Sequence, residues 1–408
     1  MTMADGLAIL AVILCAAAVL PGTLGILMLT NKIAVSESGA RYIYGKSFWV
    51  LLLSAALLLY ALFVALDGGA VSPILIGAAV VYAGILVFGF FMHTKLMFRP
   101  IRKPTFISVD EALKRFGPNE EVVGVIDEGG KPWGFIARLA RRPHIVYQPE
   151  GDHPFIMTHC ILAHSSMSYA MADRFRQPDI TITAALANNM VFYDKSNQCS
   201  VIQIQNGSLN GSLPLKTITT QAMSLKAWKD RYPDSPIWMR PIAWRDIFYL
   251  KLLARADVID PKSPVMVYPL QHDKDERLPL KAMVLGVEAG GVSKSYPLDL
   301  CKSEKLIEDR LGDVSLLVVS DDRGDFTQVF DRDVDGRVLS FKLAPNDQMT
   351  DAETGSLWAL HGVCLSGELS GKALTPIPHY NKIFWYVWSD FHPGTAIYDA
   401  PDRTQGAA

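Results

Sequence analysis

The chain opens with three long runs of apolar residues, and beyond residue 103 apolar and polar positions alternate in much shorter segments. The runs cover residues 7–29, 48–66 and 74–92, and none contains a charged side chain. Each is close to the roughly 20 residues that an α-helix needs to cross a bilayer. Water is absent there, so the backbone must satisfy its own hydrogen bonds. We therefore expect a membrane segment over residues 1–103 with three transmembrane helices.

A cleaved signal peptide is the competing interpretation of the first run. It fits less well, because the stretch MTMADG has no basic residue before the apolar run and two further runs follow.

Basic residues flank these runs unevenly. Lys32, Arg41 and Lys46 lie between the first two runs, whereas the next loop holds only Asp67, and a basic stretch over residues 95–103 follows the third run. Positive charge accumulates on the cytoplasmic side of membrane proteins. The charge pattern therefore predicts a cytoplasmic location for the part of the chain that follows.

Three motifs of the remaining chain recur at an offset of about 160 residues, which is the signature of an internal repeat. The matched pairs are VVGVIDEGGKPWGFIARL (122–139) with MVLGVEAGGVSKSYPLDL (283–300), EGDHPFIMTHC (150–160) with LGDVSLLVVSD (311–321), and AWKDRYPDSPIW (227–238) with VWSDFHPGTAIY (387–398). We predict tandem copies over residues 104–240 and 278–399. A linker with one helix over residues 241–277 would join them, and residues 400–408 would form a disordered tail.

Both predicted copies mix strand and helix patterns. Short β-branched and apolar segments bounded by Gly, Asp and Pro predict strands, namely EVVGVID, HPFIMTHC, NMVFYD, SLLVVSD and RVLSFKL. SVDEALKRFG predicts a helix with Ser108 as its N-cap and Gly117 after its C-terminus. Strands and helices do not alternate regularly. The predicted fold class is α+β, with N-terminal transmembrane helices followed by a tandem duplicated strand-rich α+β unit.

Charge and cysteine content narrow the function classes. The 408 residues carry a formal net charge of -2, which gives no reason to expect a nucleic-acid partner. The expected partners are the lipid bilayer and another membrane protein. None of the five cysteines forms a C-x-x-C motif, which argues against a zinc ribbon or a thioredoxin-type site. Spacing alone leaves open the disulfide state of Cys160, Cys199, Cys301 and Cys364.

Histidines cluster around the segment MTHCILAHSSM. His144, His153, His159 and His164 fall within 21 residues, and Cys160 lies among them. Side chains alternate along a strand, so His159 and Cys160 would face opposite sides unless the strand ends there and turns His164 back. Imidazole and thiolate ligands favour Cu or Zn over Mg or Ca. The candidate metal ligands are therefore His159, Cys160 and His164, with His153 and His144 in reserve.

Two other interpretations of this segment remain open. Cys160 would be a small buried hydrophobic residue beside ordinary polar groups, or it would be a nucleophile activated by His159 or His164. In the second copy the matching positions are Ser320 and Asp321, which offer neither thiol nor imidazole. Any chemistry therefore belongs to the first copy or to the interface between the copies.

The second copy has a motif of its own, DAETGSLWALHGVCLSGELSG, over residues 351–371. Asp351, Thr354 and Ser356 are typical of a turn whose side chains bind local backbone groups, and the turn leads to Trp358. His361 and Cys364 are spaced three apart, which makes them a second candidate pair of metal ligands.

Together these motifs resemble a bacterial family, the domain of unknown function 3179 family. The resemblance rests on GVEAGGVSKSYPL at 286–298, D-x-x-T-G-S-L-W at 351–358, a Gly-x4-Gly-x3-Gly pattern at 362–371 and W-x4-P-x-T at 388–395. The Thr-Tyr-Cys-Pro-Leu-Cys stretch of the family resembles residues 158–163, where His159 replaces Tyr and Ala163 replaces the second Cys.

The resemblance implies no established activity, and it implies an exported soluble part, against the charge pattern. The expected function is a multi-pass membrane protein that presents a metal-binding accessory module, with His164 in place of the missing thiol. The alternative is a membrane-anchored metal- or thiol-dependent enzyme that uses His159, Cys160 and His164.

Overall fold

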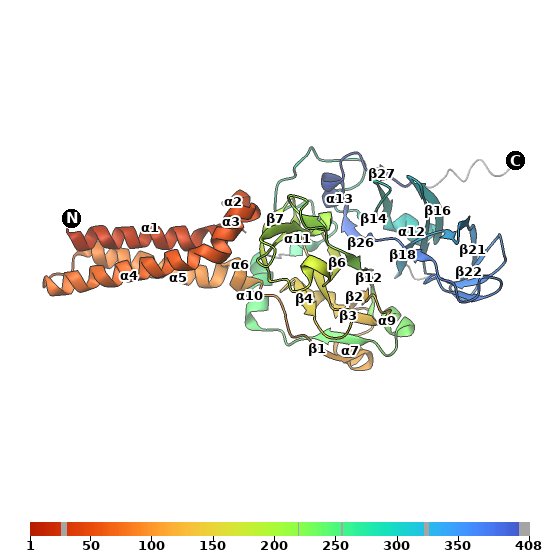
Figure 1. The fold of residues 1–408 in the computed structure, drawn as a ribbon, viewed down its shortest axis with the longest axis horizontal. Coiled ribbons are helices and arrows are strands. Elements are labelled where there is room, and N and C mark those ends of the chain that lie inside the picture. Colours follow the sequence, from red (N-terminus) through yellow and green to blue (C-terminus); the bar gives the residue numbers. More distant parts are fainter. Residues whose placement is uncertain (26–30, 219, 254–255, 322–325, 400–408) are drawn as a thin grey trace. The chain divides into compact units, whose positions relative to one another are not determined.

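The computed structural model describes residues 1–25, 31–218, 220–253, 256–321 and 326–399. Apolar helices are followed by strand-rich sheets with short helices, which confirms the α+β fold class (Figure 1). The chain divides into two compact units, Met1–Pro100 with Ala172–Leu215, and Ile101–Met171 with Lys216–Ala408. This division differs from the predicted domain boundaries, which stay predictions. The predicted disordered tail, 400–408, lies outside the described residues.

The first unit begins with the predicted apolar helices. Its long helices are α1 (Met3–Leu24), α4 (Ser47–Asp67) and α5 (Pro73–Met92), and its short ones are α2 (Asn31–Val35), α3 (Glu37–Arg41), the π-helical turn η1 (Tyr42–Lys46) and α6 (Thr94–Met97). Among the described residues, three segments are long and apolar enough to cross a membrane: Met3–Leu24, Glu37–Asp67 and Pro73–Met92. Residues 26–29 of the first predicted run lie outside the described residues.

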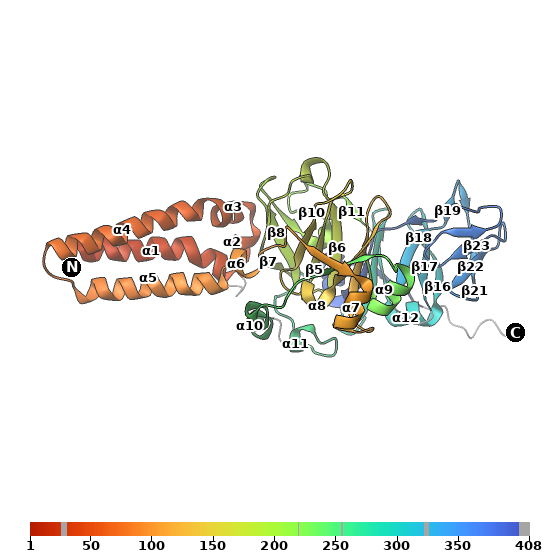
Figure 2. The ribbon, with the colours of Figure 1, turned by 90° about the horizontal axis from the view of Figure 1, so that it is seen from below.

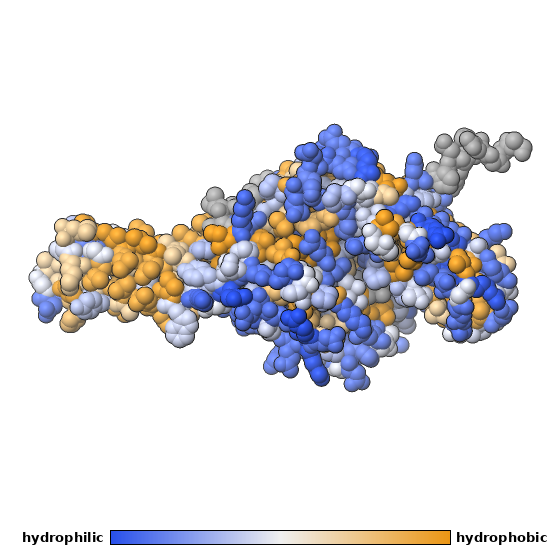
Figure 3. Space-filling model, turned by 45° about the horizontal axis from the view of Figure 1, so that its top comes forward, coloured by the Kyte–Doolittle hydropathy of each residue, from blue (hydrophilic) through white to orange (hydrophobic). Residues whose placement is uncertain are grey.

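Small side chains let these helices approach closely. Ala11, Cys15 and Ala18 of α1 are buried against apolar residues of α4 and α5, as is usual where helices pack in lipid. Figure 2 shows α1 between α4 and α5, and Figure 3 shows the apolar surface that the three helices present. At the start of α5, Ser72 caps the helix and Pro73 occupies its first turn, where a missing N–H is harmless.

A four-stranded antiparallel sheet completes the first unit. Its order is β10-β9-β8-β7, and its elements are β7 (Ile180–Leu186), β8 (Asn189–Asp194), β9 (Cys199–Ile202), β10 (Gly207–Ser208) and the 3-10 turns η2 (Asp173–Phe175) and η3 (Gln203–Gln205). The strand predicted for NMVFYD is β8. The Tyr44 hydroxyl lies 2.5 Å from Thr94 Oγ1 and 3.4 Å from the Ile182 carbonyl, which ties η1 and α6 to β7.

The second unit contains the rest of the first predicted copy. A five-stranded sheet has the order β1-β13-β3-β2-β12 and a four-stranded sheet the order β11-β6-β5-β4. The elements are β1 (Thr105–Ser108), α7 (Val109–Phe116), β2 (Glu121–Ile126), β3 (Pro132–Ile136), α8 (Ala137–Ala140), β4 (Ile145–Gln148), β5 (Phe155–Cys160), β6 (Ser165–Ala170), β11 (Thr217–Ile218), β12 (Thr220–Ser224), α9 (Leu225–Arg231) and β13 (Pro236–Met239). The predicted N-cap of α7 is confirmed, because Ser108 Oγ accepts a hydrogen bond from the Glu111 N–H at 3.2 Å.

The second predicted copy forms three further four-stranded sheets and a small hairpin. The orders are β26-β14-β15-β27, β16-β17-β18-β25 and β21-β22-β23-β24. The elements, with the two linker helices first, are α10 (Trp244–Leu253), α11 (Ala256–Ile259), β14 (Met283–Ala289), β15 (Val292–Pro297), α12 (Leu298–Glu304), β16 (Leu306–Leu311), β17 (Val314–Ser320), β18 (Thr327–Asp331), β19 (Asp333–Val334), β20 (Arg337–Val338), β21 (Phe341–Ala344), β22 (Gln348–Asp351), β23 (Leu357–Ala359), β24 (Cys364–Ser366), β25 (Thr375–Pro376), β26 (His379–Phe384), α13 (Trp385–Phe391) and β27 (Ala396–Ile397). The strand predicted for RVLSFKL is split between β20 and β21.

The strand orders of the two predicted copies correspond. The order β11-β6-β5-β4 is matched by β25-β18-β17-β16, and β13-β3-β2-β12 by β27-β15-β14-β26. Trp228 of α9 packs on Gly124 of β2, and Trp388 of α13 packs on Gly286 of β14. In both places only a glycine leaves room for the indole ring. The correspondence supports the predicted duplication, which stays a prediction.

Candidate functional site

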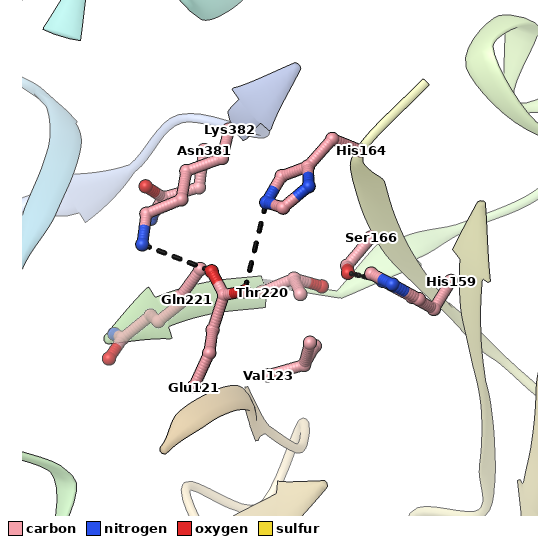
Figure 4. A pocket seen from close by; sticks show the side chains of 10 residues that line it. Glu121, Val123, His159, His164, Ser166, Thr220, Gln221, Asn381 and Lys382 are labelled. Carbon is pink, nitrogen blue, oxygen red and sulfur yellow. Dashed lines mark hydrogen bonds and ion pairs between the residues drawn. The ribbon is translucent and has the colours of Figure 1, made fainter. Parts of the chain in front are cut away.

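Two cavities in the second unit share Glu121, His159 and His164 among their lining residues. The smaller, about 10 Å³, is also lined by Val123, Ser166, Thr220, Gln221, Ala222, Asn381 and Lys382 (Figure 4). The larger, about 110 Å³, is also lined by Glu120, Ala137, Arg138, Arg141, Ile161 and Ile259. Roughly 10–15 Å³ is needed for one water molecule. The smaller cavity is therefore a niche for a single atom or water, and the larger one admits a small ligand.

Segments far apart in the sequence supply the residues of the smaller cavity. Glu121 opens β2, His159 lies near the end of β5, and His164 lies in the turn that leads to β6. Lys382 comes from β26, more than two hundred residues later. The smaller cavity therefore lies where strands of both predicted copies meet, whereas the larger one is lined by the first predicted copy and by Ile259 of the predicted linker.

Glu121 is the electrostatic centre of the site. Its carboxylate lies 3.1 Å from Lys382 Nζ and 3.7 Å from His164 Nε2, as the dashed lines in Figure 4 mark. Burial raises the pKa of Glu121, but the hydrogen bonds from His164 and Lys382 and the positive charge of Lys382 outweigh it and hold that pKa well below its usual range. Glu121 is therefore ionised at neutral pH, and its ion pair with Lys382 joins β2 to β26.

His159 is a neutral imidazole in this setting. Burial, together with the nearby positive charge of His164, lowers the pKa of His159 to about 3. The ring Nδ1 lies 2.9 Å from Ser166 Oγ, its cross-strand neighbour on β6. A base with so low a pKa holds almost no proton at pH 7 and accepts one poorly. His159 is therefore better suited to donate or accept a fixed hydrogen bond than to act as a general base.

His144 supports His159 and lies behind it. Its Nδ1 lies 2.8 Å from the backbone carbonyl of His159, and its ring is buried. Burial lowers the pKa of His144 to about 4, so this imidazole is also neutral at pH 7. His144 orients the end of β5.

Two carboxylates and two guanidinium groups line the larger cavity, but the ion pairs do not match them one to one. Glu120 pairs with Arg138 at 3.1 Å, and Glu121 pairs with Lys382 and His164. Arg141 also lines this cavity and contributes to the lowered pKa of His159. Within the described part of the chain, Arg141 forms no ion pair. Its guanidinium is therefore left to interact with whatever enters the cavity.

Gln221 lines the smaller cavity and carries an unpaired acceptor. The residue is 4% exposed, and its amide oxygen has no hydrogen-bond partner among the described residues, while the side chain also hydrogen-bonds Tyr232. A buried acceptor without a donor costs about 1–3 kcal/mol. This oxygen therefore favours a water or a ligand hydroxyl in the niche.

The structure separates the predicted metal ligands. The rings of His159 and His164 lie 6.3 Å apart between centroids, whereas Cys160 is buried and lines neither cavity. Its thiol lies toward Tyr268 and Tyr386. The pKa values of these two tyrosines are raised mainly by burial and further by Cys160. His153 is exposed in the loop before β5, beside Gly129. Over the described residues, no group of three or more His, Cys, Asp or Glu side chains is arranged to hold a metal ion.

The predicted second-copy motif forms a compact hydrogen-bonded turn around Asp351. The carboxylate accepts hydrogen bonds from the Thr354 N–H at 2.6 Å, the Ser356 N–H at 3.1 Å and Trp358 Nε1 at 2.9 Å. Asp351 and Trp358 are both buried. The motif therefore fixes the connection between β22 and β23.

The histidine and cysteine of this motif lie apart from the turn. His361 is exposed in the turn between β23 and β24. Cys364 is buried, and its thiol donates to the Ser366 carbonyl at 3.5 Å.

We expect Asp351→Asn to lower the free energy of unfolding by about 2 kcal/mol, because an amide nitrogen replaces one accepting oxygen and the lost bonds are to a charged group. Burial raises the pKa of Asp351, but the hydrogen bonds from Trp358 and Thr354 have a larger opposite effect, so the net shift of the pKa is downward. The stabilisation is therefore present above about pH 4 and is lost as pH falls through the folded-state pKa. Urea unfolding at pH 7 and pH 3 measures both effects. Asp335→Asn, at an exposed ion pair with Lys372, is the control; an equal loss there contradicts the prediction.

Sequence reasoning missed Glu121, Arg141, Gln221 and Lys382. One signal was present for two of them: Gln221 and Lys382 are polar residues in β12 and β26, the strands that precede the matched tryptophan helices. A charged or amide side chain that faces inward from a sheet strand needs a partner.

The fold and the site define an α+β protein with three candidate membrane helices and a polar cavity in its strand-rich part. The chain belongs to the DUF3179 family, described as a protein of unknown function, whose match covers residues 98–395. All residues that line the two cavities fall within this range. No curated protein and no solved structure matches the chain.

Proposed function

We propose that the chain is a multi-pass membrane protein whose strand-rich part is a binding module, built from two repeats, for a small anion such as a carboxylate or phosphate. The observation that carries this proposal is Arg141, a guanidinium that lines the larger cavity and forms no ion pair among the described residues. The two carboxylates beside it, Glu120 and Glu121, are already paired with other cations. An anion gives the Arg141 guanidinium an ion-pair partner, and a guanidinium binds carboxylate or phosphate oxygens in pairs.

Matching hydrogen bonds support the two-repeat organisation. The His159 N–H donates to the His144 carbonyl at 2.8 Å, and the Ser320 N–H donates to the Lys305 carbonyl at 2.7 Å, at an offset of 161 residues in both members. His159 pairs across strands with Ser166, as Ser320 does with Thr327. The first copy therefore carries an imidazole where the second carries a hydroxyl. This difference supports a site whose ligand-binding groups come mainly from the first copy.

The neighbouring groups fit an anionic ligand with a hydroxyl or a protonated oxygen. His164, which is about one quarter exposed, offers a ring N–H at the shared wall of the two cavities. Gln221 offers an acceptor in the niche next to it. A ligand held by Arg141 and His164 at one end can donate to Gln221 at the other.

Isothermal titration calorimetry on the purified full chain in detergent tests the proposal, with inorganic phosphate and acetate as separate probes. We expect one of them to bind and Arg141→Gln to weaken that binding at least about tenfold, since a charged hydrogen bond contributes about 1.5–3 kcal/mol. Arg115→Gln removes the same charge from an exposed pair with Glu111 and should bind as the unaltered chain does. Binding that Arg141→Gln leaves unchanged, or no binding of either probe, rules the proposal out.

A bound Zn or Cu ion is the second candidate, because two imidazoles and a carboxylate, from His159, His164 and Glu121, line the same cavities. Here metal analysis of the purified chain separates the candidates. Stoichiometric metal that His164→Ala removes and Cys160→Ser retains supports an ion held by the cavity. Metal that Cys160→Ser removes supports the thiolate ligand predicted from the sequence. The positive charge of Arg141 and Lys382 disfavours either cation.

A thiol-dependent enzyme has a separate test. It requires Cys160 to react with iodoacetamide under native conditions, whereas this thiol is 3% exposed. A reporter fused after Ala408 distinguishes the cytoplasmic location predicted by the charge pattern from the exported location implied by the resemblance.

A further inference from the structure

Helix α10, labelled in Figure 1, belongs to the folded second unit. It nevertheless exposes a row of large apolar side chains. The side chains are Ile242 just before the helix, at 53% exposed, then Trp244 at 63%, Ile247 at 51%, Phe248 at 40% and Leu252 at 46%. Single exposed apolar residues are common, but a contiguous group of them marks an interaction surface.

The opposite face of α10 is fixed by buried polar contacts. Asp246, which is 2% exposed, accepts hydrogen bonds from Arg240 at 2.8 and 2.9 Å and pairs with Arg142. Arg142 also lies over the ring of Tyr249, 5.1 Å from its centroid. Because these contacts hold the Asp246 side chain inward, the opposite face of α10, which carries the apolar row, is directed outward.

The support of α10 adjoins the point where the chain arrives from the apolar helices. Arg142 precedes β4 by three residues, and the first residue of the unit, Ile101, donates its N–H to the Ile145 carbonyl at 3.0 Å. Nine residue steps separate Ile101 from Met92, where α5 ends. A chain of that length spans about 30 Å at most, and α6 shortens it further. The part of the second unit that supports α10 is therefore the part that the chain enters first after α5, through a short covalent tether.

We infer that α10 is an interfacial helix, which lays its apolar row into the headgroup region of the bilayer that α1, α4 and α5 cross. A tryptophan at one end and cations beside the apolar row, Arg245 and Lys251, are typical of helices that lie in the membrane surface. The cations bind lipid phosphates while Ile247, Phe248 and Leu252 enter the acyl boundary. The binding module is thereby held against the membrane at a second place besides its covalent tether.

Fluorescence of a single label tests this contact on the full chain. All five native cysteines are buried free thiols, so Ile247→Cys can be labelled selectively with the fluorophore NBD, with the unaltered chain as blank. In lipid nanodiscs we expect a blue-shifted emission that doxyl-labelled phospholipid largely abolishes. Val338→Cys is the matched control, because Val338 of β20 is similarly exposed at 45% and should show water-like emission without quenching.

Two outcomes overturn the inference. One is emission at position 247 that resembles the control and is quenched by aqueous iodide. The other is a blue shift that doxyl lipid does not quench and that grows with protein concentration, which identifies a second copy of the chain as the occupant. Thermal unfolding of both labelled variants verifies that they remain folded.

Discussion

Replacement of Trp228 by alanine is expected to lower the free energy of unfolding by about 3–5 kcal/mol, the range for a buried tryptophan. The indole is fully buried, packs on Gly124 of β2, and donates its Nε1–H to Ser235 Oγ at 2.7 Å. The change removes the ring that α9 packs on the five-stranded sheet and leaves the Ser235 hydroxyl without this donor. Both losses weaken the packing of α9 against the five-stranded sheet.

The matching tryptophan provides an internal comparison. Trp388 is also fully buried, packs on Gly286 and donates to Thr395 Oγ1 at 3.0 Å, so Trp388→Ala should destabilise by a similar amount. Urea unfolding of the full chain in detergent, followed by far-UV circular dichroism, measures both. Trp244→Ala, at a 63% exposed site, is the control and should stay within about 0.5 kcal/mol of the unaltered chain. A loss at Trp228 no larger than at Trp244 contradicts the packing described here.

Replacement of Asp246 by alanine should release α10 from the second unit. The change leaves the guanidinium groups of Arg142 and Arg240, which are 14% and 17% exposed, without their shared carboxylate. Breaking a buried ion pair from one side costs about 3–5 kcal/mol, because the remaining charge is neither solvated nor paired. We expect the amides of α10 to lose most of their protection from hydrogen exchange, while those of β17 keep theirs.

The same ion pair gives α10 a defined pH dependence. Burial raises the pKa of Asp246, but the hydrogen bonds from Arg240, the Ala243 N–H and Arg142 together have a larger opposite effect and lower it overall. A depressed folded-state pKa contributes stability that is complete above about pH 4 and is lost as pH falls through that pKa. The protection factors of the α10 amides, which correct for the intrinsic pH dependence of exchange, should therefore fall below pH 4 in the unaltered chain and change little in Asp246→Ala.

A surface pair serves as the control for this prediction. Glu111 and Arg115 are both nearly half exposed, and Glu111→Ala should change stability by less than about 1 kcal/mol. Protection in α10 that survives Asp246→Ala would show that the apolar contacts of the helix, and not its buried carboxylate, hold it in place. The docking of α10 at the membrane is tested separately by the label at position 247.

Local chemistry explains the elements that could be predicted from the sequence. Ser108 caps α7 because a hydroxyl before a helix accepts a free backbone N–H. The strand at HPFIMTHC and the turn after it bring His159 and His164 to one cavity, as expected if His164 turns back toward the strand. The alternation of side chains along β5 also separates Cys160 from that cavity.

The remaining part of the site depends on contacts between distant segments. Glu121 meets Lys382 across 261 positions of the chain, and no pattern of period two or 3.6 records which strand of one sheet faces which strand of another. Arg141 is a candidate anion-binding residue because Glu120 and Glu121, the two carboxylates in its cavity, are paired with other cations. Neither arrangement can be predicted from the residues that adjoin Glu121 or Arg141 in the sequence.

The sequence by itself determined the three apolar helices, the α+β class and the family, because bilayer thickness, side-chain periodicity and motif spacing act over short stretches of chain. Only the tertiary structure decided that Arg141 lines a cavity whose two carboxylates pair with other cations, and that α10 directs its apolar residues outward. Both depend on where charges from separate segments converge: Lys382 at Glu121 in the cavity, and Arg142 at Asp246 beneath the helix. The pairing of strands in the folded protein brings these charged residues into contact, and no single segment of the sequence specifies that pairing.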